Sequence, residues 1–447
     1  MIQALGWNAY LAFHIWGQQN VPRMSPDQLR RRQSRRVRRM VRYAYRHVPH
    51  YRETMSRLGI RPGQIQCVED LSRLPLIDRN DLRRDPQAFV SRTVDLGACL
   101  QLLSSGSCGT PTTIWHDPAS LFQNAAHGER ERPVMTRALG NWRAYRETVI
   151  VSPAGASQVE IQAFVQEKGL FPRGLHRERQ YILLSDPPEK NLSLINEFRP
   201  DLLYSYGSYL DMLVRYIRET GAWWHRPKGI LYTSDNLSDA TRSWLTGECG
   251  IPVFSVYGSV EALKIGFGCE QGRGYHVNSD LYPVRIIDSR GRDAEPGQPG
   301  EVVLSNLVNR ATVLLNYRLG DLASSVPEPC TCGRTLPLIS APVGRADQIM
   351  ELPDGSEVHP IFFHGVCLSV PGIARYQVRQ TEPAALRVSL VTAPDADGQA
   401  VERRIRAGLQ ERFGASMKAE VRFVDELERT RGGKILAVIS LRQGDSC

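Results

Sequence analysis

The sequence predicts an α/β protein. We expect a large N-terminal domain of mostly parallel sheets covered by helices, a β-rich subdomain, and a small hinged α+β C-terminal domain. Three observations support this fold class: a length of 447 residues, a composition with 42% hydrophobic and 23% charged residues, and β-type runs that alternate with helical runs. We predict a basic helical region at 1–92 as part of the large domain, a core at 93–345 and a small mobile domain at 346–447.

The first 92 residues carry the positive charge of the chain, with 18 arginines, no lysine and 7 acidic residues. Most of the excess positive charge lies in 28–42, where apolar side chains recur near helical spacing, at Leu29, Val37, Met40 and Val41. The pattern predicts one amphipathic helix with an arginine face. Such a face could bind nucleic acid or an anionic surface. No motif of a known RNA reader accompanies it, so a solvated helix face is favoured.

The core is predicted from the alternation that follows. Expected strands are separated by expected helices, which predicts a mostly parallel sheet. The strands are 148–151, 181–184, 202–204, 229–233 and 253–257, and the helices are 156–168, 192–198, 209–220 and 239–247. From 284 to 325 strands and turns predominate, which indicates the β-rich subdomain. In the small domain we expect strands at 376–379, 386–391 and 420–424 around a helix at 401–413.

No run approaches the roughly 18 apolar residues that a membrane helix needs, so no transmembrane segment is expected. The N-terminal apolar run is too short and too aromatic for a secretion signal. We therefore expect a cytoplasmic protein, with a peripheral amphipathic anchor as a minor alternative. The nine cysteines are expected to be reduced thiols or metal ligands rather than disulfides.

The stretch 102–112, Leu-Leu-Ser-Ser-Gly-Ser-Cys-Gly-Thr-Pro-Thr, is the most informative motif. Hydroxyl groups and two glycines let such a loop approach a polyphosphate with its backbone N–H groups. The candidate phosphate-binding residues are Ser104, Ser105, Gly106, Ser107, Gly109 and Thr110. Taken alone, a loop of this kind is also a common turn. It is not a Walker A loop, because no Gly-Lys-Ser/Thr ends it.

Four further segments follow in a fixed order: 256–261 (Val-Tyr-Gly-Ser-Val-Glu), 317–321 (Tyr-Arg-Leu-Gly-Asp), 343–347 (Val-Gly-Arg-Ala-Asp) and 429–435 (Arg-Thr-Arg-Gly-Gly-Lys-Ile). With the first motif, they resemble the adenylate-forming superfamily of acyl-CoA synthetases, nonribosomal adenylation domains and luciferases. The basic helix running into 43–52, together with Cys-Thr-Cys-Gly-Arg at 330–334, resembles the phenylacetate–CoA ligase branch. The resemblance covers nearly the whole chain.

The resemblance implies an AMP-forming acid–CoA ligase, which activates a carboxylic acid with ATP as an acyl-adenylate and transfers the acyl group to coenzyme A. Catalysis of such a reaction depends chiefly on aligning the carboxylate with the α-phosphorus of ATP and on neutralising the negative charge of the phosphates. By match to the family pattern, Tyr257 stacks on adenine and Asp321 binds the ribose with Arg345 beside it. Glu261 is the expected Mg2+ ligand. The remaining nucleotide-site candidates are Ser234, Asp235, Gly258 and Ser259.

The same match assigns the adenylation step to Lys434 and the hinge to Asp347. A compact ammonium suits a spread phosphoryl charge, and a few residues absorb the rotation of a small domain. Some positions depart from the family pattern: Thr110 replaces a common lysine, Val260 and Leu319 replace threonines, and Gln348 replaces a second Asp. These departures remove polar contacts near the phosphates, so slow turnover is expected from a competent site.

A second candidate site is a metal site whose ligands come from two separate segments of the chain. Cys269, His276, Cys330 and Cys332 flank the nucleotide motifs, and a Cys3His set suits tetrahedral zinc. Four protein ligands leave no open position for a substrate, so this zinc is expected to be structural. Reduced thiols are the alternative interpretation.

The acyl pocket is expected at Phe122, Tyr206, Gly207 and Ser208, where the aromatic rings suit an aromatic acid. The two rings could equally belong to the core. The expected partners are a small carboxylic acid, ATP and coenzyme A. An amine or a carrier-protein thiol stays open as the acyl acceptor, and a homodimer stays open. A third class of function is a nucleic-acid or membrane-surface protein with a vestigial nucleotide site.

Overall fold

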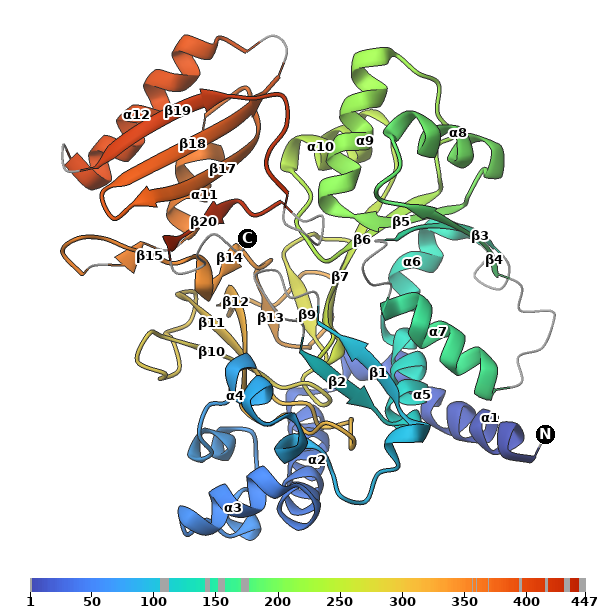
Figure 1. Cartoon of the computed structure of the whole chain (residues 1–447). Helices are drawn as coiled ribbons and strands as arrows, with labels where there is room; N and C mark the ends of the chain where they lie inside the picture. Colours follow the sequence, from blue (N-terminus) through green and yellow to red (C-terminus); the bar gives the residue numbers. More distant parts are fainter. Residues whose placement is uncertain are drawn as a thin grey trace.

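The computed structural model describes most of the chain. The described ranges are 2–104, 112–140, 145–151, 157–169, 177–355, 357–358, 360–368, 370–393, 396–414, 417–429 and 435–441. Figure 1 shows a large body that contains the N-terminus and a smaller C-terminal unit beside it. The predicted fold class is confirmed.

The N-terminal region is helical, as its apolar spacing predicts. Its helices are α1 (Ile2–Ile15), α2 (Pro26–His47), α3 (Pro49–Arg57) and α4 (Arg79–Arg84). Helix α2 begins at a capping box in which Ser25 accepts from the Gln28 N–H at 3.3 Å, with Pro26 in the first turn. Its apolar face, including the fully buried Val37, Val41 and Ala44, packs into the largest core cluster of the protein.

The arginine face of α2 is not uniformly solvated, because two of its arginines turn inward. Arg32 lies 2.8 Å and Arg36 4.0 Å from a carboxylate oxygen of Asp280, whose side chain is fully buried. Arg130, also fully buried, pairs with the same carboxylate at 2.6 Å. These positive charges lower the pKa of Asp280 well below its ordinary value despite burial. The other arginines of α2 include the exposed Arg31.

The predicted alternation of strands and helices forms the parallel half of one large sheet. Its strands follow the spatial order β4-β3-β5-β6-β7, and every neighbouring pair is parallel. They are β3 (Tyr145–Val151), β4 (Arg177–Leu183), β5 (Leu202–Tyr206), β6 (Gly229–Thr233) and β7 (Val253–Ser259). The associated helices are α5 (Pro118–His127), α6 (Arg132–Leu139), α7 (Ser157–Lys168), α8 (Pro188–Phe198), α9 (Gly207–Thr220) and α10 (Asp239–Ser243). Leu203 and Ile230, on β5 and β6, pack with α8 and α9 in a second core cluster.

The β-rich segment continues the same sheet with antiparallel pairing, so it is not a separate sheet. From β7 the order runs β8-β9-β13-β12-β11-β10, with β14 paired to β12. The bounds are β8 (Leu263–Gly268), β9 (Tyr275–Val277), β10 (Val284–Ile287), β11 (Pro299–Leu304), β12 (Tyr317–Val326), β13 (Leu338–Ile339) and β14 (Gly344–Arg345). A short hairpin of β1 (Leu100–Leu103) and β2 (Thr113–His116) lies beside it.

The C-terminal unit has its own four-stranded sheet, in the order β19-β18-β17-β20. Strands β17 (Ile373–Glu382) and β18 (Ala385–Thr392) are antiparallel, and β19 (Lys418–Phe423) and β20 (Val438–Ile439) join them in parallel. The helices are α11 (Pro360–Leu368) and α12 (Gly398–Phe413), and β15 (Met350–Glu351) pairs with β16 (Glu357–Val358). A core cluster that includes Phe363, Val388 and Ile405 joins the sheet to both helices. In the described part of the chain, no helix combines the length and apolar character needed to cross a membrane.

Candidate functional site: a nucleotide site at the junction of the two sheet halves

Three of the predicted nucleotide-binding side chains meet directly. The Tyr257 hydroxyl on β7 donates to Oδ2 of Asp321 at 2.7 Å, and Nη1 of Arg345 lies 3.2 Å from Oδ1. The register explains this meeting, because β12 places Asp321 opposite Arg345 of β14. Gly320 is required beside them: its φ is +85°, and a Cβ there would lie 2.7 Å from a guanidinium nitrogen of Arg345. Burial and the Asp321 charge raise the pKa of Tyr257, so its hydroxyl remains a donor.

Glu261, the predicted magnesium ligand, lies just beyond β7 and is only 5% exposed. Its Oε1 accepts from the Tyr317 hydroxyl at 3.3 Å, and Asn306 donates to its backbone carbonyl at 2.8 Å. Among the residues that the structure describes, no basic nitrogen lies within 4.0 Å of this carboxylate. A buried carboxylate without a protein counter-ion is costly unless a cation joins it. The environment of Glu261 therefore suits a hard divalent cation.

The base of the predicted phosphate loop is closed by two hydrogen bonds. Ser104 N–H donates to the carbonyl of Thr112 at 2.9 Å, and Thr112 N–H donates to the Ser104 hydroxyl at 2.9 Å. These bonds extend the β1–β2 hairpin up to the loop. The other loop candidates lie outside the described residues: Ser105, Gly106, Ser107, Gly109 and Thr110.

The turn that follows β6 meets the start of α9. Ser234 has a φ of +73°, and Oδ1 of Asp235 accepts from the backbone N–H of Ser208 at 3.1 Å. Gly207 permits this approach, because a Cβ there would lie 2.5 Å from the backbone of Asn236. Tyr206 is half-buried at the beginning of α9. The predicted acyl-pocket residues of the β5–α9 junction are thus adjacent to the candidates on the 233–236 turn.

Phe122 does not fit the predicted acyl pocket. Its side chain is fully buried, and its ring stacks on Trp7 of α1 with the centroids 4.8 Å apart. It belongs to a small core cluster with Leu121 and Val165. The ring is occupied in joining α1 to α5, so we correct its assignment to a core aromatic.

Several buried polar atoms around the motifs have no partner in the described part of the chain. They are the hydroxyls of Ser259 and Thr112, Oδ2 of Asp235 and Nδ1 of His116. An unmet buried hydrogen-bonding group costs about 1–3 kcal/mol. The other ring nitrogen of His116 binds the carbonyl of Val260 at 2.8 Å. Unmet polar groups at two of the five predicted segments, and at the 233–236 turn, indicate a polar ligand site.

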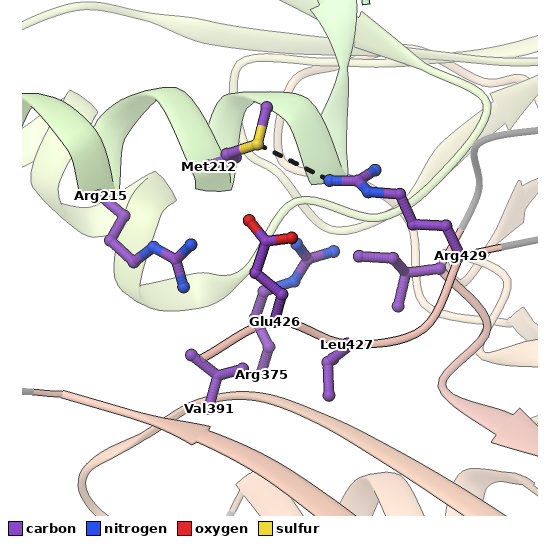
Figure 2. A pocket seen from close by; sticks show the side chains of 8 residues that line it. Met212, Arg215, Arg375, Val391, Glu426, Leu427 and Arg429 are labelled. Atoms are coloured by element: carbon purple, nitrogen blue, oxygen red, sulfur yellow. Dashed lines mark hydrogen bonds between the residues drawn. The ribbon is translucent and has the colours of Figure 1, made fainter. Parts of the chain in front are cut away.

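The C-terminal unit contacts the large domain at α9, beside this turn. Arg375 of β17 lies 4.0 Å from Oδ2 of Asp211, and the Ser238 hydroxyl donates to Oδ1 of Asp211 at 2.6 Å. Arg215 donates to the carbonyl of Asp425 at 3.0 Å. Figure 2 shows these arginines, with Arg429 and Glu426, around one small pocket. Sequence reasoning missed Asp211 and Arg375, because neither lies in a motif and 164 positions separate them.

The predicted hinge lies at the passage between the two domains. Asp347 lies in the short turn Ala346–Gln348, directly after β14 and before β15, where the chain passes from the large domain to the small one. Gln348 fixes the start of the turn, because its Oε1 accepts from the Arg345 N–H at 2.7 Å. Lys434 lies outside the described residues.

The four predicted zinc ligands come together from two distant segments. The ligand atoms of Cys269, His276, Cys330 and Cys332 all lie within 4.8 Å of one another. Two pairs have the spacing of tetrahedral edges: 3.7 Å for the Sγ atoms of Cys269 and Cys330, and 3.3 Å from Cys332 Sγ to His276 Nε2. Zinc bond lengths give edges of about 3.8 Å and about 3.6 Å. The opposite ring nitrogen of His276 lies 3.4 Å from the Leu336 carbonyl, a usual orientation for a ligating histidine.

The comparisons with known proteins agree with this architecture. Residues 350–441 match the family model of the CapK C-terminal domain. A phenylacetate-coenzyme A ligase of Thermus thermophilus is 26% identical, over 93% of this chain and 97% of the relative, and one of Aromatoleum evansii is 24% identical, over 94% and 96%. A crystal structure of 2-hydroxyisobutyryl-CoA ligase in the postadenylation state, with R3-HIB-AMP, superposes with a TM-score of 0.74 at 18% identity. The superposition covers 94% of this chain and 91% of the 2-hydroxyisobutyryl-CoA ligase chain.

The fold and these relatives support the resemblance of the chain to the adenylate-forming superfamily, in its phenylacetate–CoA ligase-like branch. The predicted enzyme class, a CoA ligase-like ligase, is confirmed with it.

Proposed function

We propose that the protein uses ATP to convert a carboxylic acid, in particular an aromatic acid, into an acyl-adenylate, and then transfers the acyl group to the thiol of coenzyme A. The observation that carries the proposal is the convergence of Tyr257, Asp321 and Arg345 near the junction of the sheet halves. This cluster comes from three of the five segments of the adenylate-forming pattern. The phenylacetate-coenzyme A ligase relatives support an aromatic acid.

The side chains present at the site suit a bound nucleotide. The Asp321 carboxylate can accept from ribose hydroxyls, and Arg345 holds it in place. The unmet hydroxyls of Ser259 and Thr112 could serve the nucleotide and its phosphates. Departure of pyrophosphate requires that negative charge be neutralised during the attack of the acid on the α-phosphorus. We assign Lys434 to that task, on the family pattern.

Glu261 would hold Mg2+, supported by its burial and by the lack of a basic partner among the described residues. When bound, the cation supplies neutralisation of phosphate charge. Tyr317 orients the carboxylate through its hydroxyl. Burial and the Glu261 charge raise the pKa of Tyr317, which keeps that hydroxyl protonated.

The cysteine and histidine cluster would hold a structural Zn2+. Its four ligands would fasten the segment after β8 and the middle of β9 to the loop between β12 and β13. We further propose that Asp347 is the hinge about which the small domain turns between adenylation and acyl transfer.

The proposal is tested by ATP–pyrophosphate exchange over a panel of aryl and alkyl acids, with mass analysis of the products formed with coenzyme A. We expect acid-dependent exchange, and an acyl-CoA product with the acid that exchanges best. Exchange without acyl-CoA, but with amide formed from an added amine, would move the proposal to an amide synthetase. Absence of exchange with every acid, by protein that retains its fold, would reject it.

A further inference from the structure

The outward face of α1 is apolar and exposed. Leu5, Ala9, Ala12, Phe13 and Trp16, the last just beyond the helix, recur at helical spacing on the exposed side. The exposed fractions are 55% for Leu5, 76% for Phe13 and 89% for Trp16. A patch of this kind marks a surface that contacts something else.

The opposite face of α1 packs against α5. Trp7 stacks on Phe122 of α5, and the Tyr10 hydroxyl accepts from the Gln123 amide at 2.6 Å. Helix α1 contains no Asp, Glu, Lys or Arg, although the exposed face of a solvated helix is normally charged. The helix is therefore anchored on one side and exposes apolar side chains on the other.

A strongly basic surface lies next to this helix. Helix α2 carries nine arginines and a single acidic residue, Asp27. Arg30, Arg31, Arg35 and Arg38 line one surface depression with Ser34. Figure 1 shows α1 and α2 at the end of the molecule away from the C-terminal unit. A short series of contacts joins the end of α1 to α2. Gln18 donates to the carbonyl of His14, in the last turn of α1, at 2.8 Å and accepts from Arg130 at 2.9 Å. Arg130 shares the carboxylate of Asp280 with Arg32 of α2.

We propose that α1 and α2 form a docking surface for an anionic lipid bilayer. Apolar side chains with a tryptophan at the polar boundary enter the headgroup region, and flanking arginines bind lipid phosphates. An apolar face beside a cluster of arginines fits an anionic lipid surface better than it fits a second copy of the chain or a nucleic acid. A second copy of the chain would bring two arginine surfaces together, and a nucleic acid would leave Leu5 and Ile15 without apolar partners.

The proposal is tested by sedimenting the full-length protein with vesicles of phosphatidylcholine alone, or with phosphatidylglycerol added. We expect binding to the anionic vesicles that weakens with added salt. Phe13→Ser with Trp16→Ser should abolish it. Arg31→Gln with Arg35→Gln should weaken it by about fivefold for each arginine, since one arginine near such a surface contributes about 1 kcal/mol.

The matched controls are Trp223→Ser, which removes a tryptophan exposed by 66% on another part of the large domain, and Arg403→Gln with Arg404→Gln on α12. Both should bind like the unmodified protein, and all variants should keep the unmodified thermal midpoint. Failure of the unmodified protein to sediment with anionic vesicles would overturn the proposal. So would an equal loss in the controls, a dimer abolished by the α1 variant without any vesicle binding, or binding to duplex DNA that competes fully and survives that variant.

Discussion

The hydroxyl of Tyr257 and Oδ2 of Asp321 are 2.7 Å apart, although 64 positions separate the two residues. The bond joins β7, the last parallel strand, to β12 in the antiparallel half. Arg345 occupies the other oxygen of the same carboxylate. One carboxylate therefore contacts both the ring that is expected to face adenine and the arginine that is expected beside the ribose.

Asp321→Asn should raise the KM for ATP, because the amide is a poorer acceptor and no longer balances the Arg345 charge. A hydrogen bond to a charged group contributes about 1.5–3 kcal/mol, which corresponds to roughly tenfold or more. Steady-state exchange kinetics measure the change. Tyr257→Phe is the control, since it keeps the ring and should have a smaller effect. An unchanged KM in Asp321→Asn would remove Asp321 from the nucleotide site.

Lys434→Ala should abolish formation of the adenylate while leaving acyl transfer from a supplied acyl-adenylate to coenzyme A. Loss of one group that stabilises transition-state charge typically lowers the rate by about 10²–10³. The two half-reactions are assayed separately. The control is Lys418→Ala, which removes an exposed lysine of β19. Equal loss of both half-reactions would contradict the assignment.

Purified protein should contain one zinc ion per chain, and Cys330→Ser should lower both the zinc content and the thermal midpoint. The reason is that structural zinc contributes directly to folding. Atomic absorption and a thermal unfolding scan provide the measurements. Cys249→Ser, which lies outside the cluster, serves as the matched control. Chelator-resistant stability with no metal in the unmodified protein would leave the four side chains as reduced thiols and a histidine.

His116 should make the folded state sensitive to mild acid. Burial lowers its pKa to about 4. Between that value and the ordinary pKa of about 6.5, the unfolded chain binds the proton and the folded chain does not, so stability falls as the pH falls. The slope from this group is at most about 1.4 kcal/mol per pH unit. Thermal midpoints from pH 7 to pH 4 should therefore decline less steeply in His116→Gln. An unchanged slope would exclude a contribution from His116.

Local sequence patterns predicted the elements well, because they depend on neighbouring residues. The five core strands and the helix at 401–413 are present, with ends that shift by a few residues. The pattern could not show that the two sheet halves are continuous, since β9 joins β13 across some sixty residues of chain. The inward turn of Arg32 and Arg36 was likewise not predictable, because it depends on Asp280, more than 240 positions away.

The candidate site shows the same contrast between features that local sequence predicts and features that depend on long-range packing. The motifs singled out Tyr257, Asp321 and Arg345, which the fold brings together, since residue type and order along the chain carry that information. They could not distinguish Phe122 in a pocket from Phe122 in a core, because only the packing of Trp7 on its ring decides the question.

The side chain of Asp211 binds two groups that belong to different parts of the molecule, Arg375 of the small domain and the hydroxyl of Ser238, which caps α10. Burial raises the pKa of this carboxyl group, so it depends on both neighbours to remain charged. If the small domain swings away, the carboxylate loses its cationic partner and keeps only uncharged ones, among them Ser238 and Thr241. The contact between the domains thus lies a few residues from Ser234 and Asp235, so that a change in domain position would be felt beside the turn expected to contact the nucleotide.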